Sequence, residues 1–161
     1  ILPLDKTKIK TLGVIGPNAN NRRCLVGNYE GTASEYVTLL EGIKAEAGED
    51  CRVLYSEGCH LFKEKVENLG IENDRQAELL SVCEASDVIV LCMGLDSGLE
   101  GEEGDEGNAY ASGDKPNLEL PGLQQQVVDM AVSTGKPVVL VLVAGSALAL
   151  TKSSHEVGAF L

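Results

Sequence analysis

The sequence has no tryptophan, and its 161 residues include only four tyrosines and two phenylalanines. Because 43% of the residues are nevertheless apolar, the interior must be built mainly from aliphatic side chains. Basic residues are also scarce: 13 lysines and arginines stand against 25 aspartates and glutamates, which gives a formal charge of -12. A surface of this charge repels phosphate groups, so we expect neither nucleic acid nor an anionic membrane to be a partner.

Long apolar runs are missing as well. No run approaches the roughly 20 residues that a bilayer span needs, and no basic-then-apolar leader opens the printed sequence, so we expect a soluble chain. The five cysteines are odd in number and follow no CxxC spacing, which argues against a zinc site and against a disulfide framework. We interpret them as reduced thiols, typical of the cytoplasm, with Cys92 as a small core residue.

Two motifs for cofactors are incomplete. Gly13 and Gly16 lack the remainder of the GxGxxG pattern of dinucleotide-binding folds. Residues 96–101 do not have the ligand spacing of an EF-hand calcium loop. We therefore expect no nucleotide cofactor and no metal.

Strand and helix patterns alternate along the chain, whose length fits one domain, residues 1–161. Ser34 is the expected cap of the first helix, and Pro121 is expected in the first turn of the third. The alternation predicts a three-layer α/β/α sandwich with a mainly parallel, doubly wound sheet. Residues 157–161 resemble the start of another buried strand, so we expect a fragment of a longer chain that lacks the end of its own domain. The expected strands are 11–15, 52–55, 87–94 and 137–143, and the expected helices are 34–48, 73–85 and 121–135.

A long acidic loop, residues 95–119, follows the third expected strand. Glycines separate its carboxylates, and no basic residue occurs before Lys115. A buried strand that leads into a long polar loop is a common way for α/β domains to build a site. Crowded carboxylates raise one another's pKa, which suits a proton donor, although such clusters also occur as merely solvated surface. Six acids of the loop are crowded within eleven residues: Asp96, Glu100, Glu102, Glu103, Asp105 and Glu106.

Four motifs, in order, resemble the C-terminal domain of family 3 glycoside hydrolases. The second of them is similar to the form found in the β-xylosidase and arabinofuranosidase branch. The resemblance covers most of the chain. The motifs are residues 2–4 with 15–19, residues 27–32 with 40–43, residues 94–104, and residues 118–124.

The resemblance implies an enzyme of two parts. In this family an N-terminal (β/α)8 barrel carries an aspartate nucleophile, and the sandwich domain contributes a glutamate as general acid/base. Neither the barrel nor the nucleophile is in this sequence, so we expect the chain to be inactive alone. The implied function is the acid/base-carrying domain of a retaining, exo-acting β-glycosidase that hydrolyses β-linked glucosides or xylosides.

The motif assigns the acid/base to one of three neighbouring glutamates. Alignment on residues 94–96 favours Glu102, with Glu100 as the second candidate and Glu103 as the third. The sequence departs from the family where Asp-Arg is expected: residues 113–115 are the better counterpart, after an insertion at residues 106–112. The alternative function is a non-catalytic binding or regulatory module whose acidic loop binds a partner or a cation.

Several other residues allow two interpretations. His60 follows a strand end, where it either faces an interdomain cleft or is hydrogen-bonded locally. Arg22 and Arg23 either contact another domain or a carboxylate, or are solvated. Tyr29 and Tyr110 either stack on sugar rings or pack in the protein.

Overall fold

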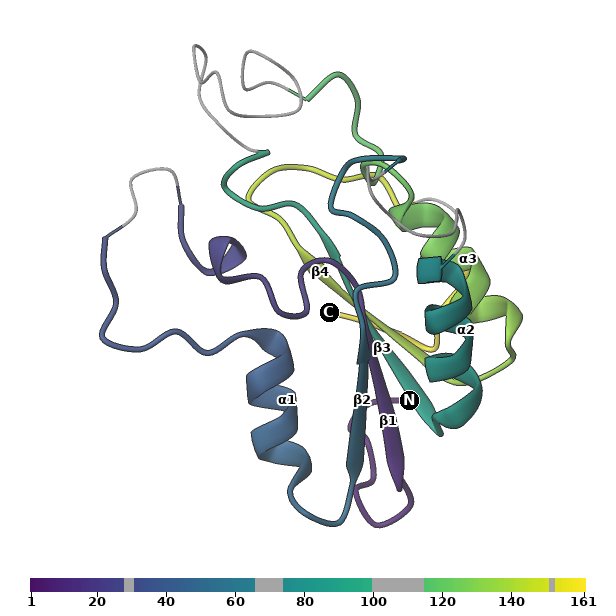
Figure 1. The fold of residues 1–161 in the computed structure, drawn as a ribbon. Coiled ribbons are helices and arrows are strands. Elements are labelled where there is room, and N and C mark those ends of the chain that lie inside the picture. The colour runs from purple at the N-terminus through teal and green to yellow at the C-terminus, as the bar shows by residue number, and fades with distance from the viewer. Residues whose placement is uncertain (28–30, 66–73, 100–114, 151–152) are drawn as a thin grey trace.

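A five-stranded parallel sheet forms the centre of the computed structural model, which describes residues 1–27, 31–65, 74–99, 115–150 and 153–161. The strand order is β2-β1-β3-β4-β5. Figure 1 shows α1 on one face of the sheet and α2 and α3 on the other. This arrangement confirms the predicted three-layer α/β/α sandwich with a doubly wound parallel sheet. The strands are β1 (Thr11–Ile15), β2 (Arg52–Ser56), β3 (Val88–Gly94), β4 (Val138–Val143) and β5 (Ala159–Phe160).

The helices follow the predicted order, with differences at their starts. A short 3-10 helix, η1, occupies Arg22–Leu25. No helix within the described ranges has the length and the apolar character needed to cross a membrane. The α-helices are α1 (Leu39–Ala47), α2 (Asp74–Ala85), α3 (Gln124–Ser133) and α4 (Ser153–Glu156).

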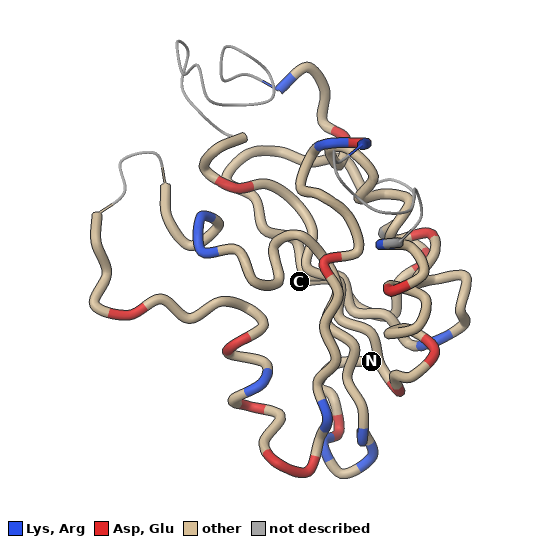
Figure 2. Tube along the Cα trace, viewed as in Figure 1, with Lys and Arg blue, Asp and Glu red and all other residues tan. Residues whose placement is uncertain are grey.

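Two aliphatic clusters fill the two sides of the sheet. On one side, α2 and α3 pack on β1, β3 and β4 through residues such as Leu79, Val128 and Ile89. On the other side, Leu40 of α1 packs with Val14 and the alternate side chains of β3. Figure 2 shows that β1, β3 and β4 carry no charged residue, as expected for strands covered on both faces.

The first helix begins four residues later than predicted, because Thr38, not Ser34, is its N-cap. The Thr38 side chain accepts a hydrogen bond from Glu41 N, and the Glu41 side chain accepts one from Thr38 N. This reciprocal capping box satisfies two backbone donors at the helix start. The hydrogen bond from the Thr38 backbone is the main reason that the pKa of Glu41 is lowered. Tyr36 lies before the helix, where its hydroxyl donates to Gly31 O.

The prediction that Pro121 lies in the first helical turn is wrong. Helix α3 begins at Gln124, and Pro121 O instead accepts a hydrogen bond from Gln124 N in a turn. Gly122 has φ +58°, a left-handed conformation that cannot continue a right-handed helix. A Cβ at this position would also lie 2.7 Å from the Phe62 carbonyl carbon, so the backbone of the two loops is in close contact.

The predicted last strand forms, as β5, but it is an edge strand with exposed ends. Ala159 and Phe160 pair with Val139 and Leu140 of β4. Phe160 is 50% exposed and Leu161 is 63% exposed. The second half of β4 is only half-buried. Val141 and Leu161 line an apolar hollow of about 380 Å³ on the α1 face of the sheet.

All five cysteines lie in the described residues and are free thiols, as predicted. Cys92 is fully buried in β3, which confirms its assignment to the core. Burial raises the pKa of Cys59 and of Cys92 to about 12 and that of Cys83 to about 11. These three thiols are therefore protonated side chains of the interior.

Candidate functional site

The carboxyl ends of the strands meet at one edge of the sheet. The register pairs Ile15 with Ser56 across β1 and β2, and Gly94 with Val143 across β3 and β4. The loops that follow these strands gather at the same end of the molecule in Figure 1. The strand order reverses direction between β1 and β3, and crevices at such points are the usual ligand sites of open α/β sheets.

Gln124 fixes the point at which β3 ends. The Gln124 side chain is fully buried, and its Oε1 accepts a hydrogen bond from Gly94 N at 2.7 Å. Its Nε2 donates to Gly94 O at 2.8 Å and to Leu61 O at 2.7 Å. One side chain thus joins the last residue of β3, the first turn of α3 and the loop after β2. The two hydrogen bonds to Gly94 are buried and the one to Leu61 is partly buried, so the backbone groups of Gly94 depend on this side chain for their partners.

Asp96 forms the next contact along the same loop. It is 7% exposed; its Oδ2 accepts a hydrogen bond from Asn21 Nδ2 and its Oδ1 accepts one from Gly98 N, each at 2.9 Å. Asn18, which is fully buried, donates from Nδ2 to Leu95 O at 3.0 Å. The loop after β1 and the loop after β3 are therefore joined by side chains at the switch point.

A hollow of about 460 Å³ opens between these loops and the loop after β4. Asp96 is the one carboxylate among its described lining residues. Burial, and then the negative charge of Asp96, raises the pKa of the Cys24 thiol on its wall. The described lining residues are Cys24, Val26, Gly27, Leu95, Asp96, Ser97, Val143, Ala144, Gly145 and Ser146.

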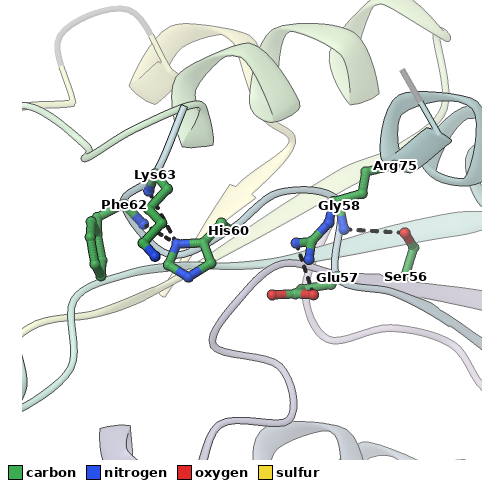
Figure 3. A network of polar contacts seen from close by, with 7 residues as sticks. All are labelled: Ser56, Glu57, Gly58, His60, Phe62, Lys63 and Arg75. Carbon is green, nitrogen blue, oxygen red and sulfur yellow. Dashed lines mark hydrogen bonds and ion pairs between the residues drawn. The ribbon is translucent and has the colours of Figure 1, made fainter. Parts of the chain in front are cut away.

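The loop after β2 forms a second polar network at this edge (Figure 3). His60 Nδ1 accepts hydrogen bonds from Phe62 N at 3.2 Å and Lys63 N at 3.1 Å, so the neutral ring carries its proton on Nε2. Burial, and then the charge of Lys63, lowers the pKa of His60. Arg75 of α2 forms an ion pair with Glu57, with Arg75 Nη1 2.9 Å from Glu57 Oε2. His60 is thus the locally hydrogen-bonded residue of the two alternatives given by the sequence.

The three predicted acid/base candidates, Glu100, Glu102 and Glu103, lie outside the described residues, as do Tyr29 and Tyr110. The residues on both sides of that segment are described and belong to the carboxyl edge. Leu99 is 1% exposed, and Lys115 Nζ donates a hydrogen bond to Ala147 O, in the loop after β4.

Three contacts of the site were not expected from the sequence: those of Asn18, Asn21 and Gln124. The burial of Gln124 could have been predicted locally, because Val127 and Val128 follow it at the spacing that places residues on one buried helix face. Asn18 and Asn21 had no such signal, since their partners are about 75 residues away. In the part of the chain that the structure describes, no group of three or more His, Cys, Asp or Glu residues could hold a metal ion.

Comparison with known proteins gives the same family for the whole chain. The model of the "Glycosyl hydrolase family 3 C-terminal domain" matches residues 1–161. The chain is 34% identical to a β-xylosidase of Formosa agariphila and 30% identical to the periplasmic β-glucosidase of Salmonella typhimurium, covering 100% and 99% of this chain and 21% of each relative. The chain therefore spans about a fifth of the length of these curated relatives.

Solved structures agree with the sequence relatives. A β-glucosidase from Erythrobacter marinus superimposes with a TM-score of 0.78 and 25% identity, over 99% of this chain and 23% of that one. An exo-β-xylosidase in complex with a xylobiose aziridine probe gives a TM-score of 0.70 and 28% identity, over 88% of this chain and 16% of that one.

Proposed function

The chain belongs to glycosyl hydrolase family 3 as its C-terminal domain, and on this premise we propose that it supplies the general acid/base of a retaining, exo-acting β-glycosidase. The proposed substrates are β-linked glucosides or xylosides, in line with the β-glucosidase and β-xylosidase names of its relatives. Because the chain spans about a fifth of those relatives, the nucleophile is proposed to lie in an N-terminal barrel outside this sequence.

The proposed reaction has two displacement steps. A carboxylate of the barrel attacks the anomeric carbon while Glu102 gives its proton to the leaving oxygen, and the glycosidic bond breaks. Water then attacks the covalent intermediate and gives its proton to Glu102, which releases the nucleophile. Glu102 must be protonated near neutral pH for the first step, and the neighbouring carboxylates of the loop favour a raised pKa.

The observation that carries the proposal is the anchoring of the acidic loop at the switch point. The loop leaves β3 next to the 460 Å³ hollow, and Asp96 fixes its first turn. After the segment that holds Glu102, the chain returns to the same edge, where Lys115 contacts Ala147 O. Both ends of the segment that carries Glu102 thus lie at the edge where open α/β sheets usually bind ligands, which supports the proposal.

The chain is proposed to be inactive alone. A retaining glycosidase needs two carboxylates in different roles, about 5 Å apart. Among the described residues, Asp96 is the only acid that lines the hollow. We propose that the nucleophilic carboxylate comes from the barrel, as the family resemblance implies.

The test is a set of glutamine substitutions in the full-length enzyme: Glu100→Gln, Glu102→Gln and Glu103→Gln, with Glu119→Gln as the control. Glu119 is the last, exposed acid of the same loop. We expect Glu102→Gln to lower kcat/KM by about 100-fold on substrates with poor leaving groups and much less on activated aryl glycosides, which need no proton.

Other outcomes of this scan have defined meanings. If Glu102→Gln is silent and Glu100→Gln causes the loss, the assignment within the loop is wrong by two residues. If none of the three variants changes the dependence on the leaving group, the acid/base proposal fails. Calcium binding by the isolated chain would then support the alternative of a cation-binding module.

A further inference from the structure

We propose that Asp96 is a positioning residue for the acid/base glutamate, acting by holding the first turn of the acidic loop against the loop after β1. This inference rests on the proposed function of that loop. It adds a residue with a separate role, because Asp96 acts on the loop backbone and not on the substrate.

Asp96 shapes the turn from which the loop leaves the sheet. Its Oδ1 accepts a hydrogen bond from Gly98 N at 2.9 Å, and its backbone carbonyl accepts one from Leu99 N at 3.0 Å. Leu99 is 1% exposed, so the turn ends in a buried anchor. A carboxylate that accepts a backbone hydrogen bond two residues ahead fixes the turn locally.

The same carboxylate joins this turn to the loop after β1. Asn21 Nδ2 donates to Asp96 Oδ2 at 2.9 Å and to Asn18 Oδ1 at 3.3 Å. Asn18 N in turn donates to Cys92 O at 3.2 Å, which ties it to β3. The Asp96 carboxylate is thus connected through two amide side chains to the rigid sheet, and such charged hydrogen bonds are stronger than neutral ones.

The turn is also closely packed on its outer side. A Cβ at Gly98 would come within 3.0 Å of Arg23 Nη2 and 3.2 Å of Asp96 Oδ1. Ser97 Oγ donates to Arg23 O at 3.4 Å. The residues 96–99 therefore have little room to shift without breaking contacts to the loop after β1.

Chain length connects this turn to the proposed acid/base. Glu102 is the third residue after Leu99, and three consecutive Cα steps span at most about 11 Å. We therefore expect a shift of the turn to change where the segment that carries Glu102 begins. Misplacing a catalytic group by about 1 Å can lower the rate by about 100-fold. We therefore expect the reaction rate to depend strongly on the conformation of this turn.

The test uses Asp96→Asn in the full-length enzyme, with two companions. The new amide would place a donor opposite the Asn21 donor and break the link between the loops. Asn21→Asp in the same molecule restores a donor–acceptor pair between positions 96 and 21, and the carboxylate at position 21 still accepts from Arg23 N, as Asn21 Oδ1 does. It does not restore the hydrogen bond that Asn21 Nδ2 donates to Asn18 Oδ1. Asp87→Asn is the matched control, because the Asp87 carboxylate also accepts two hydrogen bonds, in its case from the backbone N–H groups of Lys10 and Thr11, at the opposite edge.

We expect Asp96→Asn to lower kcat/KM by about tenfold or more on poor leaving groups and by about twofold or less on activated ones. The exchange double variant should recover part of this loss, and Asp87→Asn should not change the ratio between the two substrates. If Asp96→Asn does not fold, Asn21→Ala replaces it, because this variant also removes the hydrogen bond between Asn21 and Asp96. It should change the ratio of kcat/KM between the two substrates in the same direction.

Equal losses on both substrates, or no recovery in the double variant, would overturn the positioning role. Comparison with Glu102→Gln separates this failure from that of the proposed function. If Glu102→Gln shows the dependence on the leaving group and the Asp96 and Asn21 variants do not, the positioning inference alone is wrong.

Discussion

The amide group of Gln124 satisfies both the N–H and the C=O of Gly94, at 2.7 and 2.8 Å, in the way that a neighbouring strand would. Gly94 is the last residue of β3, and the acidic loop starts immediately after it. A side chain from α3 therefore ends the central strand and determines where the loop leaves the sheet.

Replacing Gln124 with Leu should strongly destabilise the protein. The change keeps the approximate volume but leaves Gly94 N and Gly94 O buried without partners and removes the donor to the partly buried Leu61 O. Each buried unsatisfied group costs about 1–3 kcal/mol. We expect a loss of about 3 kcal/mol or more in the free energy of unfolding, measured by urea denaturation. Gln126→Leu, on the exposed face of the same helix, is the control and should change stability by less than about 0.5 kcal/mol.

Gly94→Ala should be among the most damaging single-methyl changes in this chain. Gly94 has φ +122°, and a Cβ there would lie 2.0 Å from Val143 O, so β4 would have to move. Gly135→Ala separates the two causes, because Gly135 has φ +71° but no atom within 4 Å of the added Cβ. We expect a cost of about 1–2 kcal/mol at Gly135 from conformation alone and a larger cost at Gly94. Equal effects in thermal unfolding would contradict the close contact.

His60 should be protonated only at low pH. Its folded pKa is lowered from 6.5 by burial and by Lys63, so between the two values the unfolded chain binds more protons. Its contribution to stability is therefore complete above pH 6.5 and is lost as the pH falls through the folded pKa. Protonation of Nδ1 would break its hydrogen bonds from Phe62 and Lys63.

An NMR titration of the His60 ring measures this directly. The midpoint should lie below 6.5 and should move upward in Lys63→Gln, which removes the second cause of the shift. A midpoint at or above 6.5 in the unchanged protein would show that His60 is less enclosed than its two hydrogen bonds indicate.

The cysteines should differ in reactivity according to their burial. Cys59 and Cys92, with pKa raised to about 12, should resist alkylation by iodoacetamide in the folded protein at pH 8 and react after unfolding. Cys51, which is half-buried, should react first. Mass spectrometry of the labelled peptides gives the order, and rapid labelling of Cys92 would be incompatible with its place in β3.

Much of the fold could be predicted from local patterns. The strands predicted at residues 11–15 and 87–94 end at turns, and the strands of the structure have nearly these bounds. The start of α1 was misplaced because Ser34 and Thr38 are both good caps, and Glu41 is what favours Thr38. Pro121 was misplaced because the left-handed Gly122 depends on contact with the Phe62 backbone, which is distant in sequence.

The site was less predictable than the fold for the same reason. Asn21 and Asp96 are 75 residues apart and meet only because β1 and β3 are neighbours in the sheet. The spacing of residues within a helix or strand does not show which side chains from distant parts of the sequence come into contact. The choice of Glu102 over Glu100 depends on motif alignment, and it stays a prediction.

The most direct measurement of the central claim is the product that the full-length Glu102→Gln enzyme forms from an activated β-glycoside in the presence of azide. If Glu102 is the acid/base, azide needs no general base and can attack the covalent intermediate, so turnover should increase with azide and yield the β-glycosyl azide. The unchanged enzyme and Glu119→Gln should release only the free sugar. Failure of azide to raise turnover of Glu102→Gln, with only the free sugar released, would contradict the assignment.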